Sequence, residues 1–125
     1  MPPRVPGSRG DAAVTSMDPI DAFQTLDLRV GRVTAAEPLA GAKKPAYKLT
    51  VDFGPLGVRG SSAQLTELYR PDQLVGRFVI AAVNLGVRRI AGFASEVLVL
   101  GVPDEDGRVV LLSTERGVPA GGRVF

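Results

Sequence analysis

The sequence predicts an all-β fold, a five-stranded Greek-key barrel of the OB type with short helices and a C-terminal strand extension. Three observations support this prediction. Short alternating or apolar runs recur along the chain, Gly- or Pro-containing turns separate them, and a helix-like stretch falls between the third and fourth runs. An SH3-like barrel is the alternative architecture, and the mid-chain helix disfavours it.

The chain begins with a polar segment and a helix start. Residues 1–17 are rich in Pro, Gly, Ser and Ala, which predicts a flexible leader before a single domain over 18–125. Asp18 supplies an N-cap and Pro19 a first helical residue, so we expect a short helix through about Leu26.

Three strands are expected in the first half of the domain. The run 26–38 alternates imperfectly, and Gly31 suits a bulge or bend there. Its alternation places Val30 and Arg32 on one face, with Gly31 and Val33 on the other. The run 46–54 is the clearest half-buried strand, and 58–64 is a third strand that weakens toward a loop.

The second half is expected to continue with a helix and further strands. Leu65, Leu68 and Tyr69 have helical spacing before Pro71 interrupts the run, and a second turn over 71–74 is expected to follow. Three apolar strands are then expected within 76–83, 95–103 and 108–113, and the last residues, 121–125, suit a short edge strand.

Composition excludes most catalytic designs. Hydrophobic residues make up 45% of the chain and charged residues 22%, as in an ordinary globular protein. The chain contains no Cys and no His, so thiolate nucleophiles, imidazole bases and the usual zinc ligands are absent. The acidic cluster at 104–106 is interpreted as a solvated turn. We therefore expect a protein that is not an enzyme and needs no cofactor or metal.

The apolar runs are far shorter than the roughly 20 residues needed to cross a bilayer. The N-terminal residues also lack the apolar block of a secretory signal. A cytoplasmic location without membrane insertion is the expectation.

Basic residues are concentrated locally although the formal net charge is only +2. Lys43, Lys44, Lys48 and Arg59 stand against one acid, Asp52. This concentration predicts a local positive face. The alternative is that these side chains only solvate strand surfaces.

Polar residues interrupt the otherwise apolar stretch 84–100. Asn84, Arg88, Arg89, Ser95 and Glu96 offer amide, guanidinium, hydroxyl and carboxylate groups suited to binding a polar backbone. Neighbouring residues of an extended segment point to opposite sides, so we expect one arginine to face a ligand and the other to pair with an acid such as Glu96. The alternative for Asn84 is a turn satisfied by its own backbone.

A second polar group precedes the mid-chain helix. Ser61, Ser62 and Gln64 are placed to hold phosphate or sugar oxygens, or a peptide backbone, and the alternative is turn and capping chemistry. Tyr69 and Phe93 are the candidates for an apolar groove. Aromatic residues are only 6% of the chain, which argues against a base-stacking platform.

At these residues the chain resembles the CsaA family of bacterial export-associated chaperones, relatives of the tRNA-binding domain appended to some aminoacyl-tRNA synthetases. The resemblance runs from about Phe23 to Phe125 and includes LDLRVGRV, KKPAYKLTVDFG, SSAQLT, VNLGVRRIAGFASEVLVLGVPDEDG and the terminal GGRVF.

The resemblance implies an OB-fold homodimer that recognises unfolded polypeptide, acts in post-translational protein export with secretion components as partners, and can bind tRNA. The first hypothesis is a homodimeric cytoplasmic chaperone for unfolded or pre-export polypeptides, and the alternative is a module that recognises tRNA shape and backbone. The expected dimer surfaces are the helix near residues 19–26 and the C-terminal strands. The predicted tRNA- or peptide-binding residues are Lys48, Arg59, Ser61, Ser62, Gln64, Asn84, Arg88, Arg89, Ser95 and Glu96.

Overall fold

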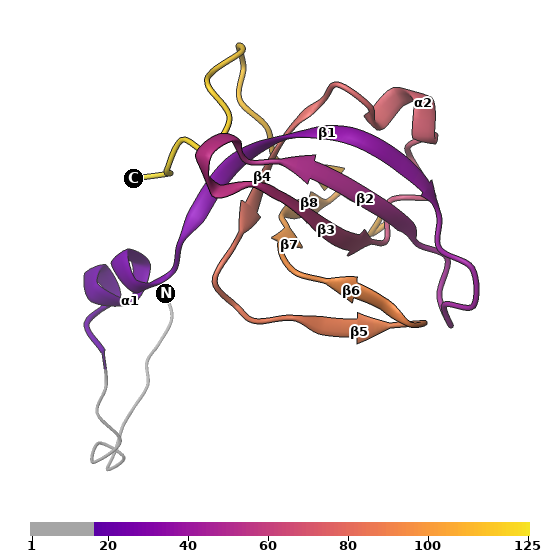
Figure 1. The fold of residues 1–125 in the computed structure, drawn as a ribbon, viewed down its shortest axis with the longest axis horizontal. Helices are drawn as coiled ribbons and strands as arrows, with labels where there is room; N and C mark the ends of the chain where they lie inside the picture. The colour runs from indigo at the N-terminus through magenta and orange to yellow at the C-terminus, as the bar shows by residue number, and fades with distance from the viewer. Residues whose placement is uncertain (1–16) are drawn as a thin grey trace.

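A computed structural model describes residues 17–125, so the predicted flexible leader over 1–17 lies outside the described residues except for Met17. The central element is an antiparallel sheet in the order β3-β2-β1-β4-β7 (Figure 1). Its strands are β1 (Leu28–Pro38), β2 (Tyr47–Asp52), β3 (Val58–Ala63), β4 (Phe78–Ala82) and β7 (Leu98–Val99).

The sheet curves into a nearly closed barrel. The first half of β1 pairs with β4 and its second half with β2, so this one long strand joins both sides of the sheet. The remaining gap lies between β3 and the segment before β7, where the Glu96 N–H donates to the Gly60 carbonyl at 2.8 Å. The predicted five-stranded OB-type barrel is therefore confirmed.

Within residues 17–125 three short helical segments accompany the barrel: α1 (Pro19–Thr25), the 3₁₀ turn η2 (Gly54–Leu56) and α2 (Pro71–Leu74). The α2 helix confirms the expected turn between the third and fourth strands, and its Leu74 is fully buried. By contrast, α1 buries none of its residues and stands away from the barrel (Figure 1). No helix within 17–125 is long and apolar enough to cross a membrane.

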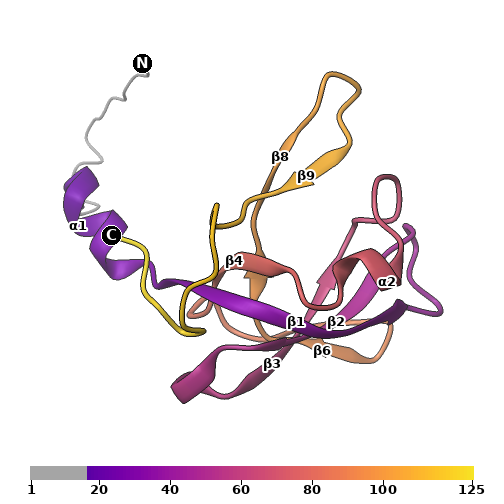
Figure 2. The ribbon, with the colours of Figure 1, turned by 90° about the horizontal axis from the view of Figure 1, so that it is seen from above.

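Two small hairpins complete the fold: β5 (Arg88–Ile90) with β6 (Phe93–Ser95), and β8 (Gly101–Pro103) with β9 (Val109–Leu111). Figure 2 shows the β8–β9 hairpin projecting from the barrel. The prediction of one continuous strand over 95–103 was wrong, because that stretch is divided among β6, β7 and β8.

The β5–β6 hairpin turns at Ala91 and Gly92. Ala91 and Gly92 have φ of 50° and 80°, which suits a two-residue hairpin turn that folds β6 back on β5. The arginines are thereby part of β5.

The core explains the pattern of β1. Val33 is fully buried with Phe53, and a Cβ on Gly31 would lie only 2.7 Å from Phe53 Cε1. The bulge expected at Gly31 is found between Val33 and Ala35 instead. Gly31 is thus needed for close packing against an aromatic ring rather than for a bend.

The C-terminal segment lies along the first half of β1, on the edge opposite β4. The Val30 N–H donates to the Gly122 carbonyl at 2.9 Å, and the Gly121 N–H donates to the Val30 carbonyl at 2.8 Å. The expected edge strand over 121–125 is present only as an isolated bridge between Arg29 and Arg123. These bonds leave the chain end beside α1 (Figure 1).

Candidate nucleic-acid interface

Two adjoining hollows lie where the end of β3 meets the β5–β6 hairpin. They share four wall residues: Ser62, Gln64, Arg88 and Ile90. The first, here named the apolar hollow, has a volume of about 380 Å³, and aliphatic side chains form most of its wall. The second, named the basic hollow, has a volume of about 620 Å³ and extends to the β1–β2 loop.

The basic hollow carries an excess of positive charge. Lys43, Lys44, Arg88 and Arg89 line it, and within residues 17–125 none of these four has a carboxylate oxygen within 4.0 Å. Nearby Lys48 differs, because its ammonium lies 3.4 Å from Glu37 Oε1. Four uncompensated cations around one hollow favour an anionic ligand.

The Ser-Glu pair fixes the hairpin to the barrel. The Gly60 N–H donates to Glu96 Oε1 at 2.9 Å, and the Ser62 N–H donates to Ser95 Oγ at 2.9 Å. These side-chain oxygens stand where the carbonyls of a neighbouring strand would otherwise accept. They satisfy the open edge of β3 and hold one wall of both hollows in place.

Glu96 therefore does not pair with either arginine, as the sequence had suggested it could. Both arginines line the basic hollow, and Arg88 also lines the apolar one. We expected only one of them to face a ligand. Among the described residues, β5 pairs only with β6.

Ser61 belongs to the interior. It is completely buried, and its hydroxyl donates to the Val97 carbonyl at 3.0 Å. In this position it cannot touch a ligand, so its predicted binding role is replaced by a structural one. Ser62 and Gln64, by contrast, line both hollows as expected of site residues.

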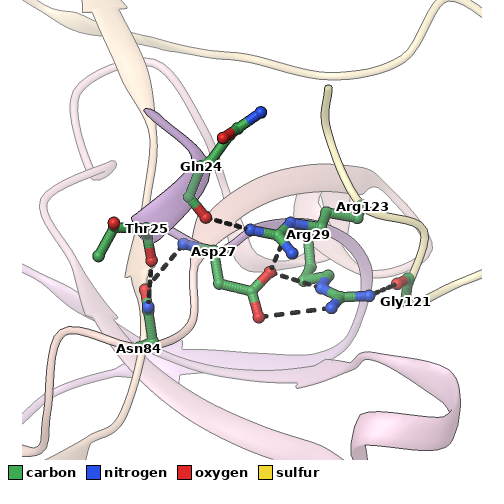
Figure 3. Close-up of polar contacts among 7 residues, drawn as sticks. All are labelled: Gln24, Thr25, Asp27, Arg29, Asn84, Gly121 and Arg123. Atoms are coloured by element: carbon green, nitrogen blue, oxygen red, sulfur yellow. Dashed lines mark hydrogen bonds and ion pairs between the residues drawn. The ribbon is translucent and has the colours of Figure 1, made fainter. Parts of the chain in front are cut away.

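Asn84 lies outside the hollows and supports the N-terminal helix. Its Oδ1 accepts from the Asp27 N–H and its Nδ2 donates to the Thr25 carbonyl, each at 2.9 Å (Figure 3). Beside it, Asp27 Oδ1 accepts from Arg29 Nε at 2.6 Å, and Arg123 Nη2 donates to the Gln24 carbonyl at 2.6 Å. Together these bonds tie α1, β1 and the C-terminal segment to one another.

Two further predicted cations do not line either hollow. Lys48 lies over the Phe93 ring at 5.7 Å in addition to its contact with Glu37, and Arg59 Nη2 donates to the Leu56 carbonyl at 3.2 Å. Both have partners within the fold. They border the candidate interface rather than form it.

Tyr69 and Phe93, which were predicted to form an apolar groove, line neither hollow. Tyr69 Oη accepts from the Leu111 N–H at 3.0 Å, and its ring faces the Arg77 guanidinium. Phe93 packs on β3, where a Cβ on Gly60 would lie 2.8 Å from Phe93 Cζ. Both rings are used in packing, and the groove that exists is lined by other residues: Ala63, Leu65, Leu85, Ile90, Val97, Leu98, Val99 and Val109.

Sequence reasoning missed these aliphatic residues because nothing in their pattern separates them from core. Lys43 and Lys44 were counted among the basic residues but were not assigned to the site. Their place in a Gly- and Pro-flanked loop between two strands was the available signal, since binding residues concentrate in such loops.

The acidic cluster is a turn in the structure. Burial raises the pKa of Asp104. Hydrogen bonds from the Arg108 and Asp106 N–H groups and from the Arg108 guanidinium lower this pKa by a larger amount, so it lies below its usual value. Within residues 17–125 no group of three or more acidic, His or Cys side chains is placed to hold a metal ion.

Comparison with known proteins agrees with this geometry. Residues 28–123 match the family described as "Putative tRNA binding domain". Among curated proteins, methionine–tRNA ligase 1 of Sorangium cellulosum is 43% identical over 105 residues, and the ligase of Methanothrix thermoacetophila is 41% identical over 103. The matches cover 84% and 82% of this chain but only 15% of each ligase.

Solved structures of chain-length relatives are also similar. The chaperone CsaA of Bacillus anthracis superposes with a TM-score of 0.81 at 47% identity, covering 88% of this chain and 100% of the other. The CsaA chaperone protein of Picrophilus torridus gives a TM-score of 0.80 at 42% identity, with 87% and 100% coverage.

Proposed function

Since this chain belongs to the tRNA-binding-domain family, and within it to the CsaA proteins, we propose that it binds tRNA without catalysing a reaction. The observation that supports this proposal is the basic hollow, whose four cations have no carboxylate partner among residues 17–125. Phosphate oxygens are the anions that such a group recognises irrespective of base sequence.

The arrangement suits a folded RNA. Lys43 and Lys44 come from the β1–β2 loop and Arg88 and Arg89 from β5, so the cations approach the hollow from two elements. Cations from two separate elements can neutralise phosphates that are close in space but distant in sequence. Recognition of backbone and shape is the general mode for structured RNA.

The proposal is tested by titrating labelled tRNA at several salt concentrations. If two phosphates are lost, Arg88→Ala with Arg89→Ala should weaken binding and reduce the slope of log affinity against log salt by about 1.8, at roughly 0.9 per phosphate. The matched control is Arg70→Ala with Arg116→Ala, which removes equal charge outside both hollows. Equal weakening by the two double variants would refute the site assignment.

A second candidate function is the capture of unfolded or pre-export polypeptides in the cytoplasm, with secretion components as partners. It is supported by the similarity to the solved structures of CsaA chaperones and by the apolar hollow. Capture by apolar contact should respond little to salt, in contrast to tRNA binding. Parallel titration with a reduced, unfolded client separates the two functions.

We also propose that the chain forms a homodimer through α1 and the C-terminal segment. Ile20 and Phe23 on α1 are 60% and 40% exposed, and Phe125 is fully exposed. These residues line one hollow of about 580 Å³ together with Gln24, Arg123 and Val124. Contiguous exposed apolar surface of this kind marks a protein interface. Two linked copies would raise the effective concentration of binding sites for one long ligand.

Light scattering of the full chain at micromolar concentration tests this part of the proposal. Wild type should have twice the mass of one chain, and Phe23→Asp should have the mass of one, because a charge would be buried without a partner. Val58→Asp places the same charge on a 60% exposed residue elsewhere and serves as the control. A wild-type mass of one chain would refute dimerisation.

A further inference from the structure

We infer that the apolar hollow is a binding site for one unpaired nucleobase, with adenine as the best-matched base. This inference rests on the proposed tRNA binding and identifies what the second hollow contributes to it. A nucleotide carries an anionic phosphate and a largely apolar base on either side of its sugar. The two adjoining hollows, one basic and one apolar, match these two parts.

The wall shared by the hollows offers unused hydrogen-bonding groups. The side chains of Ser62, Gln64 and Arg88 have no hydrogen-bond partner among residues 17–125, although each lines both hollows. Their neighbours Ser61, Ser95 and Glu96 already bond to the protein backbone. The groups that face the space between the hollows are therefore available to a ligand.

The chemistry of the wall favours a base. A glutamine amide presents an acceptor beside a donor and pairs in a bidentate manner with the adenine N6 and N7 atoms. Aliphatic side chains such as Leu85, Val97 and Leu98 can cover the faces of the ring. The volume of about 380 Å³ lies within the range of small-molecule sites and is modest for a long ligand.

Charge argues for RNA over a polypeptide at this site. Arg88 lines the apolar hollow without a carboxylate partner among the described residues, and the adjoining hollow has three further cations. A neutral extended peptide offers these cations only carbonyl dipoles and no full negative charge. A nucleotide whose base enters the apolar hollow brings its phosphate to them.

The test compares oligoadenylate and oligouridylate of equal length, labelled at the 5′ end, by fluorescence anisotropy with the full chain. Equal length keeps the phosphate contribution constant. We expect oligoadenylate to bind about tenfold more tightly, the discrimination of one bidentate base contact. Gln64→Leu preserves the size of the side chain and should remove this preference while leaving the thermal midpoint unchanged. Arg116→Ala, outside both hollows, should keep the preference.

Other outcomes overturn the inference in distinguishable ways. Equal binding of the two oligonucleotides by wild type, with tRNA still bound, would mean that RNA is held by its phosphates alone. A preference that persists in Gln64→Leu would refute the assignment to this hollow. Displacement of oligoadenylate by a neutral extended peptide would make the hollow a polypeptide site. Failure of tRNA itself to bind would instead refute the proposed function.

Discussion

Replacing Glu96 by Ala tests whether one side chain closes the barrel and supports the binding wall. The substitution removes the acceptor of the Gly60 N–H, now bonded at 2.9 Å, and leaves that donor without a partner at a half-buried edge of β3. Losing a hydrogen bond to a charged acceptor in such a place costs about 2 kcal/mol. For a domain of this size, each kcal/mol lowers the thermal midpoint by about 4 °C, so a decrease of about 8 °C is expected.

Differential scanning calorimetry measures this decrease, and amide hydrogen exchange locates it. The Gly60 amide should exchange faster in Glu96→Ala, and the Ser62 amide should follow, because Ser95 is held by the same hairpin. Glu96→Gln is the matched control, since its amide oxygen can accept the same bond. It should keep most of the stability.

The variant also links stability to binding. If the β5–β6 hairpin separates from β3, both hollows lose a wall, and affinity for tRNA should fall without any change in the cations themselves. A Glu96→Ala protein with the wild-type midpoint and unchanged exchange at Gly60 would refute this account. A Glu96→Gln protein as unstable as the Ala variant would show that the charge, not the acceptor, matters.

Three further predictions concern other parts of the fold. Gly31→Ala should lower the free energy of unfolding by about 1–3 kcal/mol in urea denaturation, because its Cβ would overlap the Phe53 ring; a stability equal to wild type would contradict this packing. Asn84→Ala should speed amide exchange in α1, with little change in the barrel, because it removes the bonds to Thr25 at the end of α1 and to Asp27 just after it; exchange rates in α1 equal to those of wild type would count against this role. Because the pKa of Asp104 is lowered in the folded state, its contribution to stability is present above its unfolded pKa and lost as pH falls through the folded value. As the pH falls below about 4, NMR spectra should therefore show the β8–β9 turn losing its structure before the barrel does. Loss of the turn and the barrel at the same pH would argue against this role of Asp104.

The order of the barrel elements could be predicted because it depends on local patterns. Alternation over 46–54 predicted one buried face, and a second helical turn was expected over 71–74, so β2 and α2 lie near their expected positions. The short strands β5 to β8 could not be separated in the same way. Their boundaries follow from a turn at Ala91 and Gly92 and from pairing partners that are distant in the chain.

The candidate site shows the same division. Ser62, Gln64, Arg88, Arg89 and Ser95 were identified by residue type and do line the hollows. Other residues of suitable type turned out to have partners within the fold. Burial of Ser61 and the contact of Asn84 with α1 are consequences of packing that no spacing in the sequence reveals.

The sequence by itself determined an all-β barrel without Cys or His and with two groups of basic residues, because strand periodicity and residue chemistry are local properties. Only the tertiary structure decided which polar groups remain available to a ligand. The Gly60–Glu96 contact joins residues 36 positions apart, and whether a carboxylate binds an arginine, a ligand or a backbone N–H depends on which partner the closed barrel brings within reach.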